Sequence, residues 1–238
     1  MAGRVFDPAS RARLVVVQLC LATQNPHKVT ELRALLRACA PALEDQLELL
    51  SLSDLAVVDE VVEDGATFAA NAQIKARAAA LSTGLWALAD DSGLQVDALG
   101  GAPGVLSARY AGEPRSDARN LSALLAAIAA VPAEGRGAKF HCSLCLCGPS
   151  ATAADTYLSE GSVSGSLLTA ACGQDGFGYD PIFVPTEAEL HAASLPLTLL
   201  GQSFAMLSLA QKNQLSHRTR AVRAMLPNLI ALVAQQNA

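Results

Sequence analysis

Two adjacent carboxylates, Asp90 and Asp91, follow an apolar run that begins at Trp86 and has the composition of a buried strand. Neighbouring acids repel one another, and near an apolar core their desolvation is unfavourable unless a positive partner lies beside them. A second acid pair, Glu63 and Asp64, precedes an Ala-rich stretch. Carboxylates from separate segments are oxygen ligands for Mg²⁺, which also keeps waters and substrate phosphates. The pairs predict a divalent-metal site, with helix N-terminal capping as the alternative role of Glu63 and Asp64.

The positive groups that such a site needs occur in two short segments. The first, "TQNPHK", joins a predicted strand to a predicted helix and ends at Lys28. Free backbone N–H groups and the helix dipole make such a turn an anion site, and Lys28 adds a full charge. The second, "QKNQLSHRTR", gathers Lys212, Ser216, His217 and Arg218. A solvated surface is the alternative for both segments. Together they supply Lys28, Lys212 and Arg218 as candidate phosphate partners.

An aromatic pair stands between glycines in "GQDGFGYDP", where Phe177 and Tyr179 are two residues apart. The whole chain holds only six Phe, three Tyr and one Trp, so this concentration is informative. A Gly-flanked aromatic side chain on a loop can serve as a stacking platform for a base. A turn with one aromatic ring tucked inward is the alternative.

Composition limits the classes of protein that this chain can represent. With 238 residues and 51% hydrophobic residues, it can bury a sizeable core. A net charge of −5, with no basic cluster beyond "HRTRAVR", argues against a nucleic-acid-binding surface. No apolar run reaches the ~18 residues of a membrane span, and no signal peptide is evident. We expect a cytoplasmic protein with no membrane partner, a flexible extension over residues 1–13, and one domain over 14–238.

Six cysteines include Cys142 and Cys145 at CxxC spacing. They fall in a predicted strand, where residues three apart point to opposite faces, so a shared metal or disulfide is disfavoured. We interpret these cysteines as small buried hydrophobic residues that stay reduced.

The hydrophobic pattern predicts an α/β protein. Strands are expected at 14–23, 47–52, 86–91, 139–148 and 155–168, and helices at 26–39, 67–84, 116–131 and from about 217. Asn25 suits a helix N-cap, and Pro26 suits the first helical position. Asp90 and Asp91 are expected to end their strand, because Ser92 and Gly93 favour a sharp turn. Early strands alternate with helices and later strands are paired, so the central sheet should be mixed.

The motifs "LATQNPHK", "EDGATFAANAQIKA", "ADDSGLQVDALGGAPGVLSARYAGE", "GFGYDPIFVP" and "KNQLSHR" resemble, in order and spacing, the Ham1 family of inosine/xanthosine triphosphate pyrophosphatases. The resemblance extends from about Leu14 to the C-terminal helix. It implies an elongated, two-lobed α/β fold around a central cleft, usually as a homodimer. The implied activity is Mg²⁺-dependent hydrolysis of non-canonical purine nucleoside triphosphates to the monophosphate and pyrophosphate, which cleanses the nucleotide pool.

The resemblance also assigns roles to residues. Glu63 and Asp91 would hold the metal, Asp91 would accept the proton of the attacking water, and Lys28 would stabilise the developing charge. The implied substrate-binding residues are Thr23, Gln24, Asn25, Pro26, His27, Lys28, Ser92, Phe177, Gly178, Tyr179, Asp180, Lys212, His217 and Arg218. Arg218 is the candidate donor to the oxygen at C6 of the base, because a guanidinium has no acceptor.

Three features depart from the family pattern. Gln24 replaces a glycine, which bears on how closely the backbone approaches phosphate. Met206 replaces an acid, which suggests a missing ion pair or helix cap. The segment from about Glu187 to Gln202 is longer than usual and is expected at the rim of the cleft. Two alternative functions remain: a nucleotide-binding sensor without turnover, and a pyrophosphatase of the related Maf type with other nucleotide specificity.

Overall fold

The computed structural model describes residues 15–57 and 61–237. The expected extension over residues 1–13 lies outside the described residues. The strands are β1 (Val17–Leu21), β2 (Leu47–Ser51), β3 (Trp86–Val96), β4 (Gly137–Cys147), β5 (Thr156–Leu167) and β6 (Phe183–Pro185). The α-helices are α1 (Pro26–Cys39), α2 (Phe68–Thr83), α3 (Asp117–Ala127), α4 (Glu187–Ala192), α5 (Leu209–Leu215) and α6 (His217–Gln236). Within the described part of the chain, no helix is both long and apolar enough to cross a membrane.

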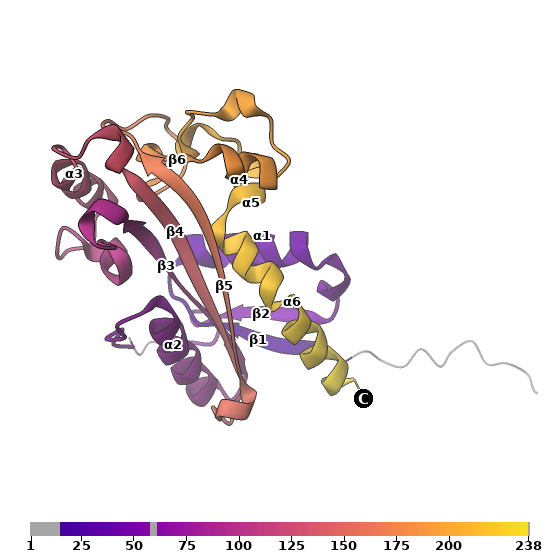
Figure 1. The fold of residues 1–238 in the computed structure, drawn as a ribbon. Helices are drawn as coiled ribbons and strands as arrows, with labels where there is room; N and C mark the ends of the chain where they lie inside the picture. The colour runs from indigo at the N-terminus through magenta and orange to yellow at the C-terminus, as the bar shows by residue number, and fades with distance from the viewer. Residues whose placement is uncertain (1–14, 58–60, 238) are drawn as a thin grey trace, which may run out of the picture.

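The six strands form one mixed sheet in the order β2-β1-β3-β4-β5-β6. β1 runs parallel to β2 and β3, whereas β3, β4, β5 and β6 are successively antiparallel. The mixed sheet predicted from the sequence is therefore confirmed. The long strands β4 and β5 run the length of the molecule and join the end that carries β1 and β2 to the end that carries α3, α4 and β6 (Figure 1).

Local sequence explains where the helices that flank the site begin and end. α1 starts at Pro26 as predicted, because the Pro ring presets the helical φ. Thr67 caps α2, its hydroxyl accepting from the backbone N–H of Ala70 at 3.1 Å. Gly84 ends α2 at φ 69°, a left-handed conformation that glycine adopts without steric cost. Glu63 is not the cap of α2, and its carboxylate lies beside the Lys75 ammonium instead.

Buried side chains form a core on each face of the sheet and a third core at the far end. The helices α1 and α6 cover one face through Leu residues such as Leu32 and Leu229. The Ala-rich helix α2 lies close against the other face, where Cys145 is buried. Cys142 belongs to the first core, so the prediction that Cys142 and Cys145 point to opposite faces is confirmed. The third core surrounds Phe183 between α3, α4 and β6.

The prediction that Asp90 and Asp91 end their strand is wrong. β3 continues to Val96 because β4 pairs with it along its whole length, with Asp91 opposite Ser143. What ends near the acids is β1, whose register with β3 stops at Leu88. Gly93 makes no turn either: a Cβ there would lie 2.3 Å from the Ser107 hydroxyl, so glycine is needed for close packing.

Candidate active site

A cavity of about 840 Å³ opens beyond the end of β1, between the two ends of the molecule. It gathers most of the predicted site residues from five separate segments: Thr23, Gln24, Asn25, Lys28, Glu63, Asp91, Ser92, Phe177, Gly178, Tyr179, Asp180, Lys212, His217 and Arg218. Pro26 begins α1 and does not line the cavity. His27 lies in the first turn of α1. The tertiary structure thus brings nearly the whole predicted set to one place.

Asp91 faces α2, and its carboxylate has two partners from that helix. Asn71 donates its side-chain N–H to Oδ2 at 3.1 Å, and the Lys75 ammonium lies 3.3 Å from Oδ1. Lys75 also lies 2.9 Å from a carboxylate oxygen of Glu63. Asn71 accepts from the backbone N–H of Gly65 at 2.8 Å, which fixes the segment that carries Glu63. Two residues one turn apart on α2 therefore hold both predicted metal ligands together.

Opposing effects act on the charges of this group. Burial raises the pKa of the Asp91 carboxyl, and the charge of Glu63 adds to this effect, while Lys75 opposes it. Burial would lower the pKa of the Lys75 ammonium, but Asp90, Asp91 and Glu63 outweigh burial and hold it above its ordinary value. Lys75 is thus a cation, and Asp91 is a stronger base than an ordinary aspartate.

Asp90 projects to the opposite face of the sheet, as alternation along a strand requires. Its buried carboxylate lies 3.1 Å from the Lys28 ammonium and 3.4 Å from Nε of Arg218. Arg218 in turn donates to Glu31 of α1 and to the Ser92 hydroxyl, the latter at 2.9 Å. Burial raises the pKa of Asp90, but Lys28 and Arg218 outweigh burial and hold the pKa well below its ordinary value. The adjacent acids avoid mutual repulsion by facing different cations.

The glycine-flanked loop after Gly176 forms the other end of the cavity. Phe177 is 52% exposed, whereas the Tyr179 ring is buried and its hydroxyl donates to the backbone carbonyl of Ser107 at 2.8 Å. An exposed ring and an inward-tucked ring are thus both present in this loop, on Phe177 and Tyr179. Asp180 accepts from the Phe177 backbone N–H at 3.0 Å and pairs with Lys212. Burial raises the pKa of Asp180 while Lys212 opposes this.

The "SHR" segment is buried, which is the opposite of the solvated helix-turn-helix alternative. Ser216 ends α5 and caps α6, accepting from the Arg218 backbone N–H at 3.2 Å. The His217 ring stacks on Phe140 with centroids 5.0 Å apart. Its Nδ1 is a buried nitrogen without a hydrogen-bond partner in the described structure. Burial lowers the pKa of His217 well below its ordinary value, and Arg218 and Lys212 add to this.

Because the native state resists protonation of His217, stability should fall in mild acid. Below the unfolded-state pKa of about 6.5, the His217 side chain is protonated in the unfolded chain but stays neutral in the native state. This stability is present above that pH and is lost as the pH falls toward the native pKa, at up to about 1.4 kcal/mol per pH unit. Urea unfolding at pH 7.5 and 5.0 should show a smaller loss for His217→Gln than for wild type. Equal losses would contradict a neutral buried His217.

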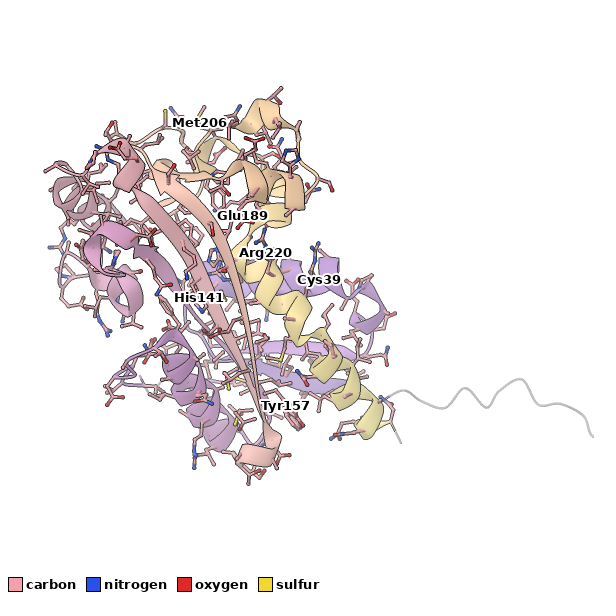
Figure 2. The ribbon with its side chains drawn as sticks, in the orientation of Figure 1. Cys39, His141, Tyr157, Glu189, Met206 and Arg220 are labelled. Atoms are coloured by element: carbon pink, nitrogen blue, oxygen red, sulfur yellow. The ribbon has the colours of Figure 1, made fainter. Side chains whose placement is uncertain are left out.

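The departures from the family pattern have structural outcomes. Gln24 has no positive φ, so the backbone there does not require glycine. Met206 is 48% exposed and removes no cap, because Ser208 and Gln211 form a complete capping box at the start of α5. Met206 lies at the outer edge of its end of the molecule (Figure 2).

The expectation that residues 187–202 form the rim of the cleft is wrong. None of these residues, all of which the structure describes, lines the cavity. Instead, α4 contacts α6 through an ion pair between Glu189 and Arg220, whose side chains point toward one another in Figure 2. Glu189 also accepts from the backbone N–H of Ser164 at 2.8 Å, so the segment packs on β5.

Sequence reasoning assigned no role to Lys75, Asn71 or Glu31. The signal for the first two was their spacing of four residues in "NAQIK", which places both side chains on one helical face. Glu31 shares α1 with Lys28 at a spacing of three residues. No local feature indicated that Glu31 would pair with Arg218, because these residues are 187 positions apart.

The donor set fits a magnesium ion that is completed by substrate. Among residues 15–57 and 61–237, no group of three or more His, Cys, Asp or Glu side chains could hold a metal. Glu63 and Asp91 nevertheless converge on one cation, the Lys75 ammonium. Mg²⁺ commonly takes one or two carboxylates together with waters and phosphate oxygens. Two carboxylates therefore suffice where a triphosphate supplies further oxygens.

The chain has clear relatives. The model of the Ham1 family matches residues 19–228. A dITP/XTP pyrophosphatase of Corynebacterium efficiens is 44% identical over 219 residues, which cover 92% of this chain and 100% of that protein. The HAM1 protein of Coxiella burnetii has a TM-score of 0.75 at 36% identity, covering 91% of this chain and 100% of that structure. A dITP/XTP pyrophosphatase of Mycobacterium abscessus gives 0.68 at 42% identity, covering 89% and 100%. With this match and this cavity, the chain belongs to the Ham1 family.

Proposed function

We propose that this protein hydrolyses non-canonical purine nucleoside triphosphates, such as dITP, ITP and XTP, to the monophosphate and pyrophosphate. This proposal rests mainly on one observation: the same cavity has Glu63 and Asp91 at one end and Phe177 at the other. One end suits a phosphate chain with its metal, and the other suits a base. The names of the relatives, dITP/XTP pyrophosphatases, support the same substrates and the same bond.

In the proposed reaction, water attacks the α-phosphorus of the triphosphate and its proton passes to Asp91. The bond between the α-phosphorus and the bridging oxygen breaks, and pyrophosphate leaves. Asn71 orients the Asp91 carboxylate, and Lys28 offsets negative charge on the phosphates. When bound by Glu63 and Asp91, Mg²⁺ supplies further stabilisation of charge on the phosphate oxygens. Positioned charges of this kind carry most of the catalysis in phosphoryl transfer.

A pyrophosphate-release assay with dITP, XTP, dGTP, dTTP and ATP tests the proposal. We expect rapid release from dITP and XTP, little from the other nucleotides, and loss of activity when EDTA removes Mg²⁺. Tight nucleotide binding without release would identify a sensor instead. Faster release from dTTP than from dITP would indicate the specificity of another pyrophosphatase family.

Phe177→Ala should raise KM for dITP and XTP by about tenfold while leaving their order unchanged. Stacking of a base on an aromatic ring contributes about 1–3 kcal/mol and is largely insensitive to ring substituents. Phe177→Trp keeps a stacking surface and serves as the matched control, with KM close to wild type. A loss confined to one purine would assign Phe177 to base selection rather than stacking. Steady-state kinetics on both nucleotides make the distinction.

We also propose a homodimer that acts in the cytoplasm. The side of β5 that faces away from α6 exposes Leu158 and Glu160, which supports a second copy of the chain covering this face. All six cysteines are free thiols, which suits a reducing compartment. Light scattering coupled to size exclusion tests the dimer: a mass of one chain at micromolar concentration would contradict it.

A further inference from the structure

The Lys75 ammonium stands between the two carboxylates assigned to the metal. It lies 2.9 Å from Glu63 and 3.3 Å from Asp91, and only 13% of its side chain is exposed. Glu63 comes from the segment before α2, and Asp91 comes from β3. Two acids from separate segments would repel one another in this partly buried place, and Lys75 supplies the charge that holds them together.

We propose that Lys75 is the resident counter-ion of the metal-binding carboxylates and competes with Mg²⁺ for them, so that metal binds well only together with nucleotide. This inference rests on the proposed function. A divalent cation bound by Glu63 and Asp91 would lie close to the Lys75 ammonium, which contacts both carboxylates, and like charges repel strongly at such distances. Metal entry is therefore opposed as long as the Lys75 ammonium stays in place. The triphosphate supplies other negative oxygens, which give the displaced ammonium a new partner.

The position of Lys75 on its helix supports this exchange. Its neighbour one turn earlier, Asn71, holds Asp91 Oδ2 and the Gly65 backbone, so Asp91 and the backbone beside Glu63 keep a partner when Lys75 departs. A lysine side chain has a flexible stem and three rotatable donors, and it can swing without movement of the helix. Both Lys75 and Lys28 line the same cavity, but Lys28 pairs with Asp90 on the other face of the sheet. Lys28 therefore carries the same charge in the same cavity but does not pair with Glu63 or Asp91, so it serves as the control for Lys75.

Mn²⁺ binding in the absence of nucleotide, followed by electron paramagnetic resonance of the free ion, tests the proposal. Wild type should bind Mn²⁺ weakly, and Lys75→Met should bind it at least about tenfold more tightly, because the competing charge is gone. Lys28→Met removes an equal charge without vacating the carboxylates and should change the affinity by less than about threefold. Metal-free Lys75→Met should also melt at a lower temperature, and Mn²⁺ should raise its Tm more than that of wild type.

Tight Mn²⁺ binding by nucleotide-free wild type, no gain in Lys75→Met, or an equal gain in Lys28→Met would each overturn the proposal. If Lys75→Met does not fold, wild type provides a second measurement: acetylation of Lys75, read by mass spectrometry, should increase as Mn²⁺ is added, and an unchanged rate would overturn the proposal. Pyrophosphate release from dITP is measured on the same wild-type preparation. If dITP is hydrolysed but Lys75→Met shows no change in Mn²⁺ affinity, only the proposed role of Lys75 is wrong. If no nucleotide is hydrolysed, the proposed function is wrong.

Discussion

Asp91→Asn should lower kcat for dITP by about 10²–10⁴-fold, because the variant loses the proton acceptor and a charged metal ligand while the side chain keeps its shape. The Kd for nucleotide should stay within about threefold of wild type, since Lys28 and Phe177 are untouched. Single-turnover kinetics separate the two quantities. More than about a tenth of wild-type kcat in this variant would remove Asp91 from the proposed chemistry.

The stability of Asp91→Asn should equal or exceed that of wild type. Burial and Glu63 raise the pKa of Asp91, so its ionised form is less favourable in the folded chain than in the unfolded chain. A neutral amide removes that unfavourable charge. Thermal unfolding at pH 7.5 checks the sign, and a clear fall in Tm would mean that the ion pair with Lys75 outweighs the burial of the acid.

The same substitution at the neighbouring residue, Asp90, should lower the stability of the fold more than it lowers turnover. Asp90→Asn should lower the free energy of unfolding by about 3 kcal/mol, because it leaves Lys28 and Arg218 without their shared buried partner. The pKa of Asp90 is held low, so its stabilising effect is complete above the unfolded-state pKa and is lost only as the pH falls through the native value. KM for nucleotide should rise, since Lys28 loses its anchor, while kcat falls less than in Asp91→Asn.

Urea unfolding of Asp90→Asn, Lys28→Met and the double variant measures the coupling directly. We expect Lys28→Met to destabilise the wild type more than it destabilises the Asp90→Asn background, because the pair is already broken there. Additive losses would show that the two residues do not interact. A free energy of unfolding for Asp90→Asn within about 0.5 kcal/mol of wild type would contradict the anchoring role altogether.

The central error of sequence reasoning concerned the end of β3. "DDSG" has the composition of a turn, and an apolar run before it suggested that the strand stopped there. Pairing with β4 outweighs that local preference, because each residue from Ala87 to Val96 has a partner on β4 in the antiparallel register. A continuous strand places Asp90 and Asp91 on opposite faces. The two acids are therefore adjacent in sequence but contact different cations on opposite faces of the sheet in the fold.

The sequence by itself determined the class of fold, the helix ends at Pro26 and Gly84, and most of the side chains that line the cavity. Each of these depends on local signals: apolar periodicity, capping residues and short motifs with characteristic spacing. Only the tertiary structure decided which cation faces which acid. Lys75 meets Asp91 because α2 packs on β3, and Arg218 meets Asp90 because α6 packs on the opposite face. Such pairs are determined by the packing of helices on a sheet, and no property of either residue's own segment specifies the distance between them.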